Sequence, residues 1–66
     1  MPIVKVIEVL AESANSWEDA AQSAVKQASG SIKNIKSLYI KDMQAIVDND
    51  KIVNYRLNAK ISFVVE

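Results

Sequence analysis

The segment KIVNYRLNAKISFVVE, residues 51–66, decides the fold because apolar and polar residues alternate along it. Apolar residues occupy the odd positions from Val53 to Val65, and polar residues occupy the even positions from Asn54 to Ser62. Successive side chains of a strand point to opposite faces of a sheet. This segment therefore predicts a strand with one face for a core and one face for water or a partner.

Two further strands are predicted upstream. Residues 3–10, IVKVIEVL, are typical of a strand that is apolar on both faces, and residues 11–16 follow as a loop. Such a strand either contacts a helix on one side and a neighbouring subunit on the other, or is an apolar edge strand. Residues 35–47, IKSLYIKDMQAIV, predict a long, bent strand. Its alternation assigns Leu38, Ile40 and Ile46 to one face and Ser37, Tyr39, Lys41, Met43, Ala45 and Val47 to the other.

A helix is predicted to begin at Trp17 and to end between residues 29 and 33. Apolar residues recur there at three- and four-residue spacing, with polar residues on the opposite side. Ser16, followed by Asp19, resembles a capping box in which the hydroxyl and the acid each satisfy an exposed backbone amide. Gly30 predicts the end of the helix.

The order of the elements predicts the topology. Residues 48–50, Asp-Asn-Asp, are typical of a tight turn, so the last two strands form a hairpin. The helix returns the chain, and the last strand can then lie between the other two and run antiparallel to both. We predict a single α+β domain over residues 1–66, with β-α-β-β order and a three-stranded antiparallel sheet, order 1-3-2, packed on one helix.

Composition favours a chain that assembles with copies of itself. A domain of 66 residues buries only about 60% of its unfolded surface, so domains of this size usually need disulfides, a metal or oligomerisation. The chain contains no Cys and no His, while half of its residues are hydrophobic. The net charge is zero, which argues against nucleic acid as a partner. No apolar run is long enough for a membrane span, and we expect a cytoplasmic protein.

The sequence does not favour an enzyme. Without His, its serines lack the usual activating base, and the one Gly excludes a Gly-rich phosphate loop. Three features allow two interpretations each. Residues 48–50 resemble either a calcium ligand cluster or a plain hairpin turn, and EF-hand spacing is absent because Val53 and Ala59 stand at its sixth and twelfth positions. Trp17 is either a stacking platform or a core or interface residue. Arg56 is either an exposed salt-bridge partner or a ligand contact.

The whole chain resembles the dodecin family. The segments KVIEV, SWEDAAQSAVKQA and NYRLNAKISFVVE carry the resemblance, which runs without gaps over nearly all 66 residues. The resemblance implies a three-stranded antiparallel sheet wrapped around one helix, with twelve copies assembled as a hollow homododecamer. Flavin-binding dodecins hold pairs of isoalloxazine rings between tryptophans, with a glutamine bonded to the ring edge, and act as flavin stores or buffers rather than enzymes.

The family pattern places its ligand-binding residues at positions that differ in this chain. The stacking tryptophan falls at Ser37 and the glutamine at Arg56. Tyr39, two residues from Ser37 on the same predicted face, is the available substitute for the missing aromatic ring. A branch of the family without the tryptophan has been linked to calcium, and SWEDAA and YR resemble that branch. The resemblance implies a storage shell with flavin (riboflavin, FMN or FAD) binding weakened or lost. The alternatives are a calcium-binding shell with metal ligands from neighbouring subunits, a flavin binder that uses another stacking residue, and an assembly module without a ligand.

Overall fold

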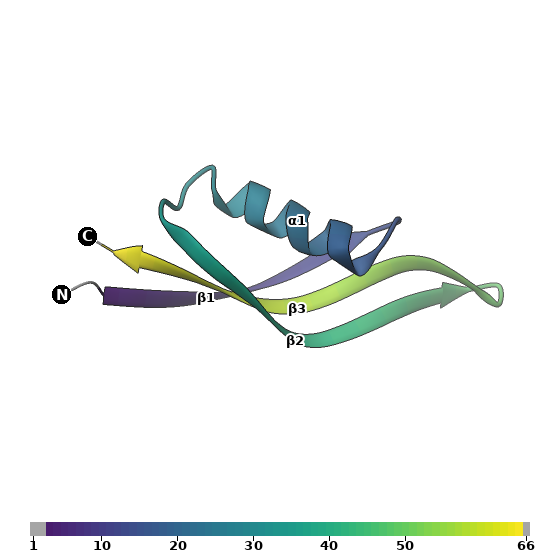
Figure 1. Ribbon diagram of the computed structural model, residues 1–66. Helices are drawn as coiled ribbons and strands as arrows, with labels where there is room; N and C mark the ends of the chain where they lie inside the picture. Colours follow the sequence, from purple (N-terminus) through teal and green to yellow (C-terminus); the bar gives the residue numbers. More distant parts are fainter. Residues whose placement is uncertain (1–2, 66) are drawn as a thin grey trace.

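The computed structural model describes residues 3–65, in which one helix lies across one face of a three-stranded sheet (Figure 1). The elements are β1 (Ile3–Ser13), α1 (Trp17–Ala28), β2 (Ile35–Asp48) and β3 (Lys51–Val65). The strand order is β1-β3-β2, and both pairs are antiparallel. The predicted α+β fold and its 1-3-2 order are confirmed. Glu66, the last residue of the predicted final strand, lies outside the described residues.

The core lies between α1 and the alternate apolar residues of β3, the central strand. Leu57, Ala59 and Ile61 are completely buried, as is Ala20 of the helix. Because an alanine carries no side chain beyond Cβ, Ala20 lets the helix axis approach the sheet closely. The residues between these core positions face away from the helix. The alternation in β3 therefore defines a helix-side face of the sheet and an outward face.

The start of α1 is capped as predicted, but only on one side. The Ser16 hydroxyl accepts a hydrogen bond from the Asp19 amide at 3.0 Å. The Asp19 carboxylate does not return to the Ser16 amide as the capping box predicted. It accepts instead from the Ser13 hydroxyl at 2.6 Å, and Ser13 Oγ in turn accepts from the amide of Asn15 at 2.9 Å. Ser13, buried at the end of β1, is the nearer partner for a side chain as short as aspartate.

The helix ends at Ala28, one residue before the predicted interval. One more turn of backbone follows, in which the Ile32 amide donates to the Ala28 carbonyl at 2.8 Å. Gly30 does not adopt the left-handed conformation that usually makes glycine a helix terminator. Asn34 does, with φ of 63°, and it directs the chain into β2. Asparagine is one of the few residues that tolerate this region.

β1 is an edge strand and extends three residues beyond its predicted end. Residues 11–13 were expected to form a loop, but they pair with Leu57, Arg56 and Tyr55 of β3. The long central strand supplies partners for them, so pairing overrides their weak strand propensity. One consequence is that Glu12 stands directly beside Arg56.

β2 bends, as predicted, but its two faces were assigned wrongly after residue 41. Ile40 lies opposite Ala59 and Asp42 opposite the adjacent Asn58, so Lys41 is an extra residue in a β-bulge. A bulge shifts the alternation by one residue. The residues opposite core positions of β3 are therefore Leu38, Ile40, Met43 and Ala45, whereas Ile46 stands opposite Asn54 on the outward face.

The predicted turn at residues 48–50 is confirmed as a two-residue hairpin loop. Asp48 pairs with Lys51, and the two residues between them, Asn49 and Asp50, have φ of 53° and 63°. Positive φ at both positions is the signature of a type I′ turn, which matches the twist of the strands it joins. The end of this hairpin, residues 46–54, extends beyond the N-terminus of α1 (Figure 1). We call these nine residues the hairpin arm.

Candidate functional site

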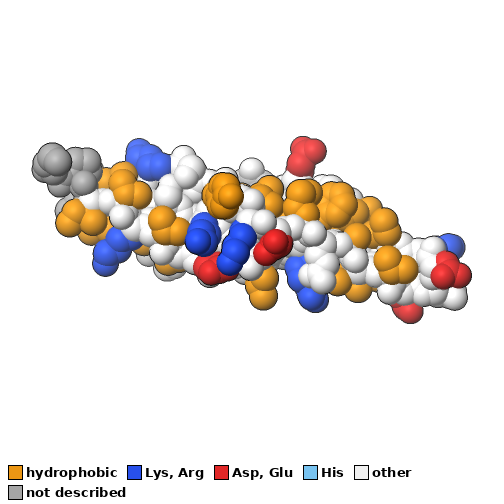
Figure 2. All heavy atoms as spheres, turned by 90° about the horizontal axis from the view of Figure 1, so that it is seen from below, with side chains coloured by type: hydrophobic (Ala, Val, Ile, Leu, Met, Phe, Trp, Pro, Cys, Tyr) orange, Lys and Arg blue, Asp and Glu red, His pale blue; other side chains and the backbone are white. Residues whose placement is uncertain are grey.

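The outward face of the sheet carries the residues that the sequence singled out. Viewed from this side, apolar side chains are spread along the molecule, with charged side chains among them in its middle part (Figure 2). The exposed apolar residues here include Val6 at 56%, Leu10 at 72% and Tyr39 at 66%. Such exposure is high for residues in the middle of strands. This face is therefore suited to contact a ligand or another copy of the chain.

Arg56 is held by an acid from the neighbouring strand. Its Nε donates to Glu12 Oε1 at 2.6 Å, and its Nη2 lies 2.5 Å from the same oxygen. The two side chains are 40% and 44% exposed, so the pair contributes only about 0–1 kcal/mol to folding. Its larger effect is on the site. The guanidinium is already neutralised within its own chain, and Arg56 is a salt-bridge partner.

Ser37 is paired with another hydroxyl. Its Oγ lies 2.5 Å from the Oγ of Ser62, the residue opposite it on β3. Tyr39 lies two residues further along the same face, opposite Lys60. Its ring is exposed and offers an aromatic surface that Ser37 does not. Ser37 and Tyr39 therefore share one face of β2, as alternation predicted, and the register shows that Arg56 lies on the same, outward face of the sheet.

Ser37 and Arg56 are nevertheless far apart within one chain. Ser37 stands opposite Ser62, which is six residues from Arg56 along β3. At about 3.4 Å per residue, this separates the two positions by about 20 Å. Tyr39, opposite Lys60, is four residues and about 13 Å from Arg56. One flavin ring system is too small to contact both Ser37 and Arg56 of the same chain. A ligand of this size could contact both positions only if a second copy of the chain supplied one of them.

Two further features of this face were not predicted. Lys41, the extra residue of the bulge, places its Nζ 3.7 Å from Glu8 Oε2. Asn58 lies between Leu10 and Asp42, and its buried Oδ1 has no hydrogen-bond partner among residues 3–65. The polar residue at this position was visible in the alternation of β3. Its unsatisfied oxygen depends on the local approach of neighbouring strands, which the sequence does not specify.

Trp17 belongs to the other face of the sheet. Its indole packs edge-to-face on Tyr55, with ring centroids 4.9 Å apart and an angle of 74° between the planes. Its Nε1 donates to the backbone carbonyl of Gln44 at 3.1 Å. Both the ring and the polar atom are thus used to join α1 to the base of the hairpin arm. Trp17 is half-buried, and its contacts within the chain agree with the interpretation of a core or interface residue.

The acids at the hairpin tip do not form a metal site within one chain. Asp48 precedes the type I′ turn and Asp50 is one of its two central residues. No group of three or more His, Cys, Asp or Glu side chains suited to a metal is found within residues 3–65. Of the two interpretations, the turn describes this segment. The same residues include no helix long and apolar enough to cross a bilayer.

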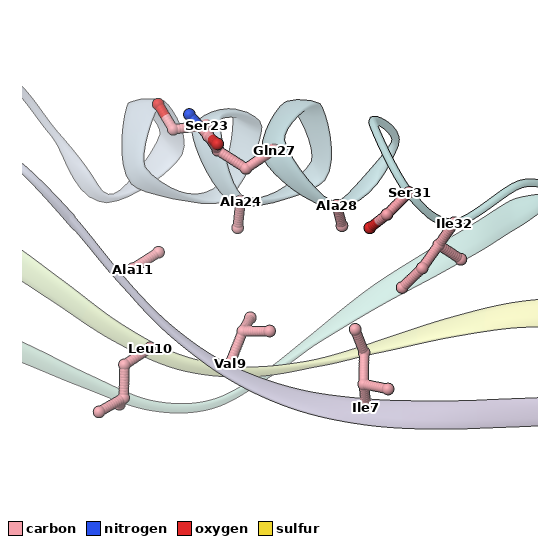
Figure 3. A pocket seen from close by; sticks show the side chains of 10 residues that line it. All are labelled: Ile7, Val9, Leu10, Ala11, Ser23, Ala24, Gln27, Ala28, Ser31 and Ile32. Atoms are coloured by element: carbon pink, nitrogen blue, oxygen red, sulfur yellow. The ribbon is translucent and has the colours of Figure 1, made fainter.

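A second concave surface lies between α1 and the edge strand β1. This groove of about 380 Å³ is lined mainly by small and aliphatic side chains (Figure 3). Ala24 and Ala28 point into it from the helix, and Ile7 and Val9 face them from β1, with Ile32 at one end. No charged side chain of the described residues lines it. The sequence pattern did not predict this groove, because it places these alanines on the apolar side of the helix without showing that space remains between that side and β1.

Comparison with known proteins agrees with this fold. The family model described as Dodecin matches residues 3–66. The chain belongs to the dodecin family. It is 33% identical over 63 residues to the calcium dodecin of Mycobacterium tuberculosis, a match that covers 96% of this chain and 89% of that protein.

Two solved dodecin structures show how closely the backbones agree. The crystal structure of an arginine-to-alanine mutant of T. thermophilus dodecin gives a TM-score of 0.94 at 18% identity, covering 100% of this chain and 98% of that chain. The crystal structure of the M. tuberculosis calcium dodecin, described as having a novel calcium-binding site, gives 0.83 at 31% identity. That match covers 97% of this chain and 91% of the other. The dodecin fold is thus retained over the whole described chain.

Proposed function

We propose that this dodecin is a non-enzymatic, cytoplasmic homododecamer that binds or stores a small ligand, with its flavin binding weakened or lost. One observation carries the proposal. The two positions at which flavin-binding dodecins are expected to hold the stacking tryptophan and the glutamine are Ser37 and Arg56, and each is engaged by a neighbour in its own chain, Ser62 and Glu12. The absence of His and Cys from the sequence supports a binding role over catalysis.

The chemistry of both substitutions disfavours a flavin. Stacking on an aromatic side chain contributes about 1–3 kcal/mol per ring, as judged from base–aromatic stacking, and a hydroxymethyl group offers no such surface. A glutamine amide both donates and accepts, whereas a guanidinium only donates. Arg56 can therefore donate to the acceptors of a ring edge but cannot accept from a donor beside them, so it cannot reproduce both hydrogen bonds of the glutamine. A bound ligand would also have to compete with Glu12 for the guanidinium.

Tyr39 supports the variant of this proposal in which flavin binding persists with a different stacking residue. Its ring is 66% exposed on the same face as Ser37. Replacing Tyr39 by Leu keeps the bulk and removes the aromatic surface. If Tyr39 stacks on flavin, this variant should bind more weakly than the parent, and if the site is lost, the two should be equal.

Flavin fluorescence tests the main proposal. Riboflavin and FMN are each titrated with the protein, and quenching of the flavin emission is followed. We expect no saturable quenching at micromolar protein, because Ser37 stands where the family places its stacking tryptophan. Strong, saturable quenching in that range would refute weakened binding.

A calcium-binding shell is the second candidate, and the similarity to the M. tuberculosis calcium dodecin favours it. No group of three acids within residues 3–65 is suited to hold the ion, so acids of neighbouring copies would have to converge. Calorimetric titration with CaCl2, together with melting curves in CaCl2 and in EGTA, tests this candidate. Binding heat and a calcium-dependent rise in melting temperature would support it, and the lack of both would eliminate it.

A further inference from the structure

Gln44 is a polar residue of β2 that the bulge brings to the outward face. Counted by simple alternation from Ser37, residue 44 falls on the opposite face of its strand. The extra residue at Lys41 shifts the alternation by one, and Gln44 becomes the cross-strand partner of Arg56. Directly opposed residues share a face of the sheet. The candidate site therefore contains a side-chain amide that the sequence pattern did not place there.

Three polar residues form one row across the sheet at this level. Glu12 of β1 is the partner of Arg56 of β3, and Arg56 is in turn the partner of Gln44 of β2. Side chains directly opposite each other in an antiparallel pair have Cβ atoms about 4.5–5.5 Å apart, so the Gln44 amide is within reach of the space beside the Arg56 guanidinium. Glu12 contacts the same guanidinium from the other side. We call Glu12, Arg56 and Gln44 the polar row.

The side-chain amide of Gln44 is exposed and keeps both its donor and its acceptor for a ligand. No residue from 3 to 65 forms a hydrogen bond with this amide, whereas the backbone carbonyl of Gln44 accepts from the Trp17 indole at 3.1 Å. That bond fixes the backbone from which the amide projects. Arg56 is more engaged, because its Nε and Nη2 both lie against Glu12 Oε1. Its Nη1 group is the part of the guanidinium that can still donate to a ligand.

The polar row matches the hydrogen-bonding pattern of an imide edge, in which an N–H lies between two carbonyl groups. A glutamine amide can donate to the first carbonyl and accept from the N–H, and a guanidinium can donate to the second carbonyl. Gln44 thus supplies the acceptor that Arg56 lacks. Because Glu12 neutralises the guanidinium, the row suits an uncharged edge better than an anion.

We propose that Gln44 is the specificity-determining residue of this site and that its ligand is a planar heterocycle with an uncharged imide edge. Gln44 accepts from the N–H of that edge, and Arg56 donates to the carbonyl beside it. The proposal rests on the proposed function, which puts the small-ligand site on this face, and it names the residue and the ligand class. The substitution at Ser37 then removes the stacking surface, while recognition of the ring edge is kept by Gln44 in place of residue 56.

A variant that restores stacking makes this contact measurable with riboflavin, which carries an imide edge. Ser37→Trp supplies the aromatic ring and leaves the polar row intact, and quenching of the riboflavin emission gives the Kd. Gln44→Leu is then added, which keeps the bulk of the side chain and removes both of its hydrogen-bonding groups. Gln22→Leu, the same change at an exposed position of α1, is the matched control. Ser37→Phe replaces Ser37→Trp if the tryptophan variant does not assemble.

We expect Ser37→Trp alone to bind riboflavin saturably. Adding Gln44→Leu should raise the Kd by about fivefold or more, because two neutral hydrogen bonds are lost, and adding Gln22→Leu should leave the Kd unchanged. Riboflavin methylated at N3 lacks the N–H of the imide edge and separates a direct contact from a structural effect. Methylation should weaken binding when Gln44 is present and should weaken it much less in the Gln44→Leu protein.

Two results would overturn the role of Gln44. One is a smaller rise in Kd with Gln44→Leu, or an equal effect of methylation in both proteins. The other is the lack of riboflavin binding by the aromatic variant while Arg56 is retained, whether or not Arg56→Gln then restores it. The proposed function is decided separately by the parent protein, since strong quenching there would refute weakened flavin binding whatever the effect of residue 44.

Discussion

Replacing Ser37 by Trp and Arg56 by Gln in one chain should restore flavin binding. Both positions are on the outward face. Each substitution removes one hydrogen bond or ion pair on that face and leaves the core unchanged. The hydroxyl bond between Ser37 and Ser62 is exposed, and the pair between Arg56 and Glu12 is nearly half exposed. Together these losses should reduce the free energy of unfolding by no more than about 2 kcal/mol. The double variant is therefore expected to fold and assemble.

The gain in affinity follows from the stacking surface. An aromatic side chain contributes about 1–3 kcal/mol per stacked ring, which corresponds to about 5- to 150-fold in the dissociation constant. The amide at position 56 supplies a hydrogen-bond acceptor that the guanidinium lacks. Because the amide is neutral, it forms no ion pair with Glu12 that a ligand would have to displace. Titration of riboflavin and FMN, read as loss of flavin fluorescence, measures the change against the parent protein.

The matched control is Ser37→Leu with Arg56→Gln, which supplies bulk at position 37 but no aromatic face. It should bind flavin no better than the parent. A Trp-containing double variant that assembles and yet binds no better than this control would show that the family positions have been transferred to the wrong residues.

Three smaller predictions concern folding and are measured by thermal unfolding at one protein concentration. Leu57→Ala should destabilise the protein by about 2–5 kcal/mol, because Leu57 is completely buried under the helix; a loss below 1 kcal/mol would contradict the position assigned to the core. Ser16→Ala should cost about 1 kcal/mol through loss of the cap on the Asp19 amide, and Ser16→Asp, which can still cap, should recover most of it. Glu12→Gln should change stability by less than about 1 kcal/mol, because its pair with Arg56 is exposed, and a larger loss would mean that the pair is buried in the assembly.

Most of the fold could be predicted from the sequence because its strongest pattern belongs to the central strand. The central strand packs one face against the helix, so every second residue of that strand must be apolar. Apolar and polar residues alternate in this way from Val53 to Phe63. The type I′ turn was predictable for a similar reason. Asn49 and Asp50 are residue types that accept positive φ, and the turn needs two of them in succession.

The errors arose where pairing between strands overrides local pattern. Residues 11–13 have weak strand propensity, yet the long β3 provides partners for them. The bulge at Lys41 moved Met43 and Ala45 to the helix-side face, and nothing in the local sequence marks an extra residue there. The left-handed turn before β2 occurs at Asn34 rather than at Gly30, so the single glycine was a misleading signal.

The candidate site was predicted only as residues on the faces of two separate strands. Alternation placed Ser37 and Tyr39 on one face of their strand and Arg56 on the polar face of the central strand, and the register shows that these are the same face of the sheet. Alternation does not show how far apart two residues of different strands lie once the strands pair. It also does not show which residues become neighbours across the strands. The pairing of Arg56 with Glu12 depends on the extension of β1, and the separation of about 20 Å between Ser37 and Arg56 depends on the β2–β3 register.

The mass of the purified protein in solution tests the central claim most directly, since the proposed function places the ligand-binding face in an assembled shell. One chain has a mass of 7.3 kDa, so twelve copies have a mass of about 88 kDa. Size-exclusion chromatography with light scattering should give this value at micromolar concentration, without calcium or flavin. A mass near that of a single chain would contradict the account.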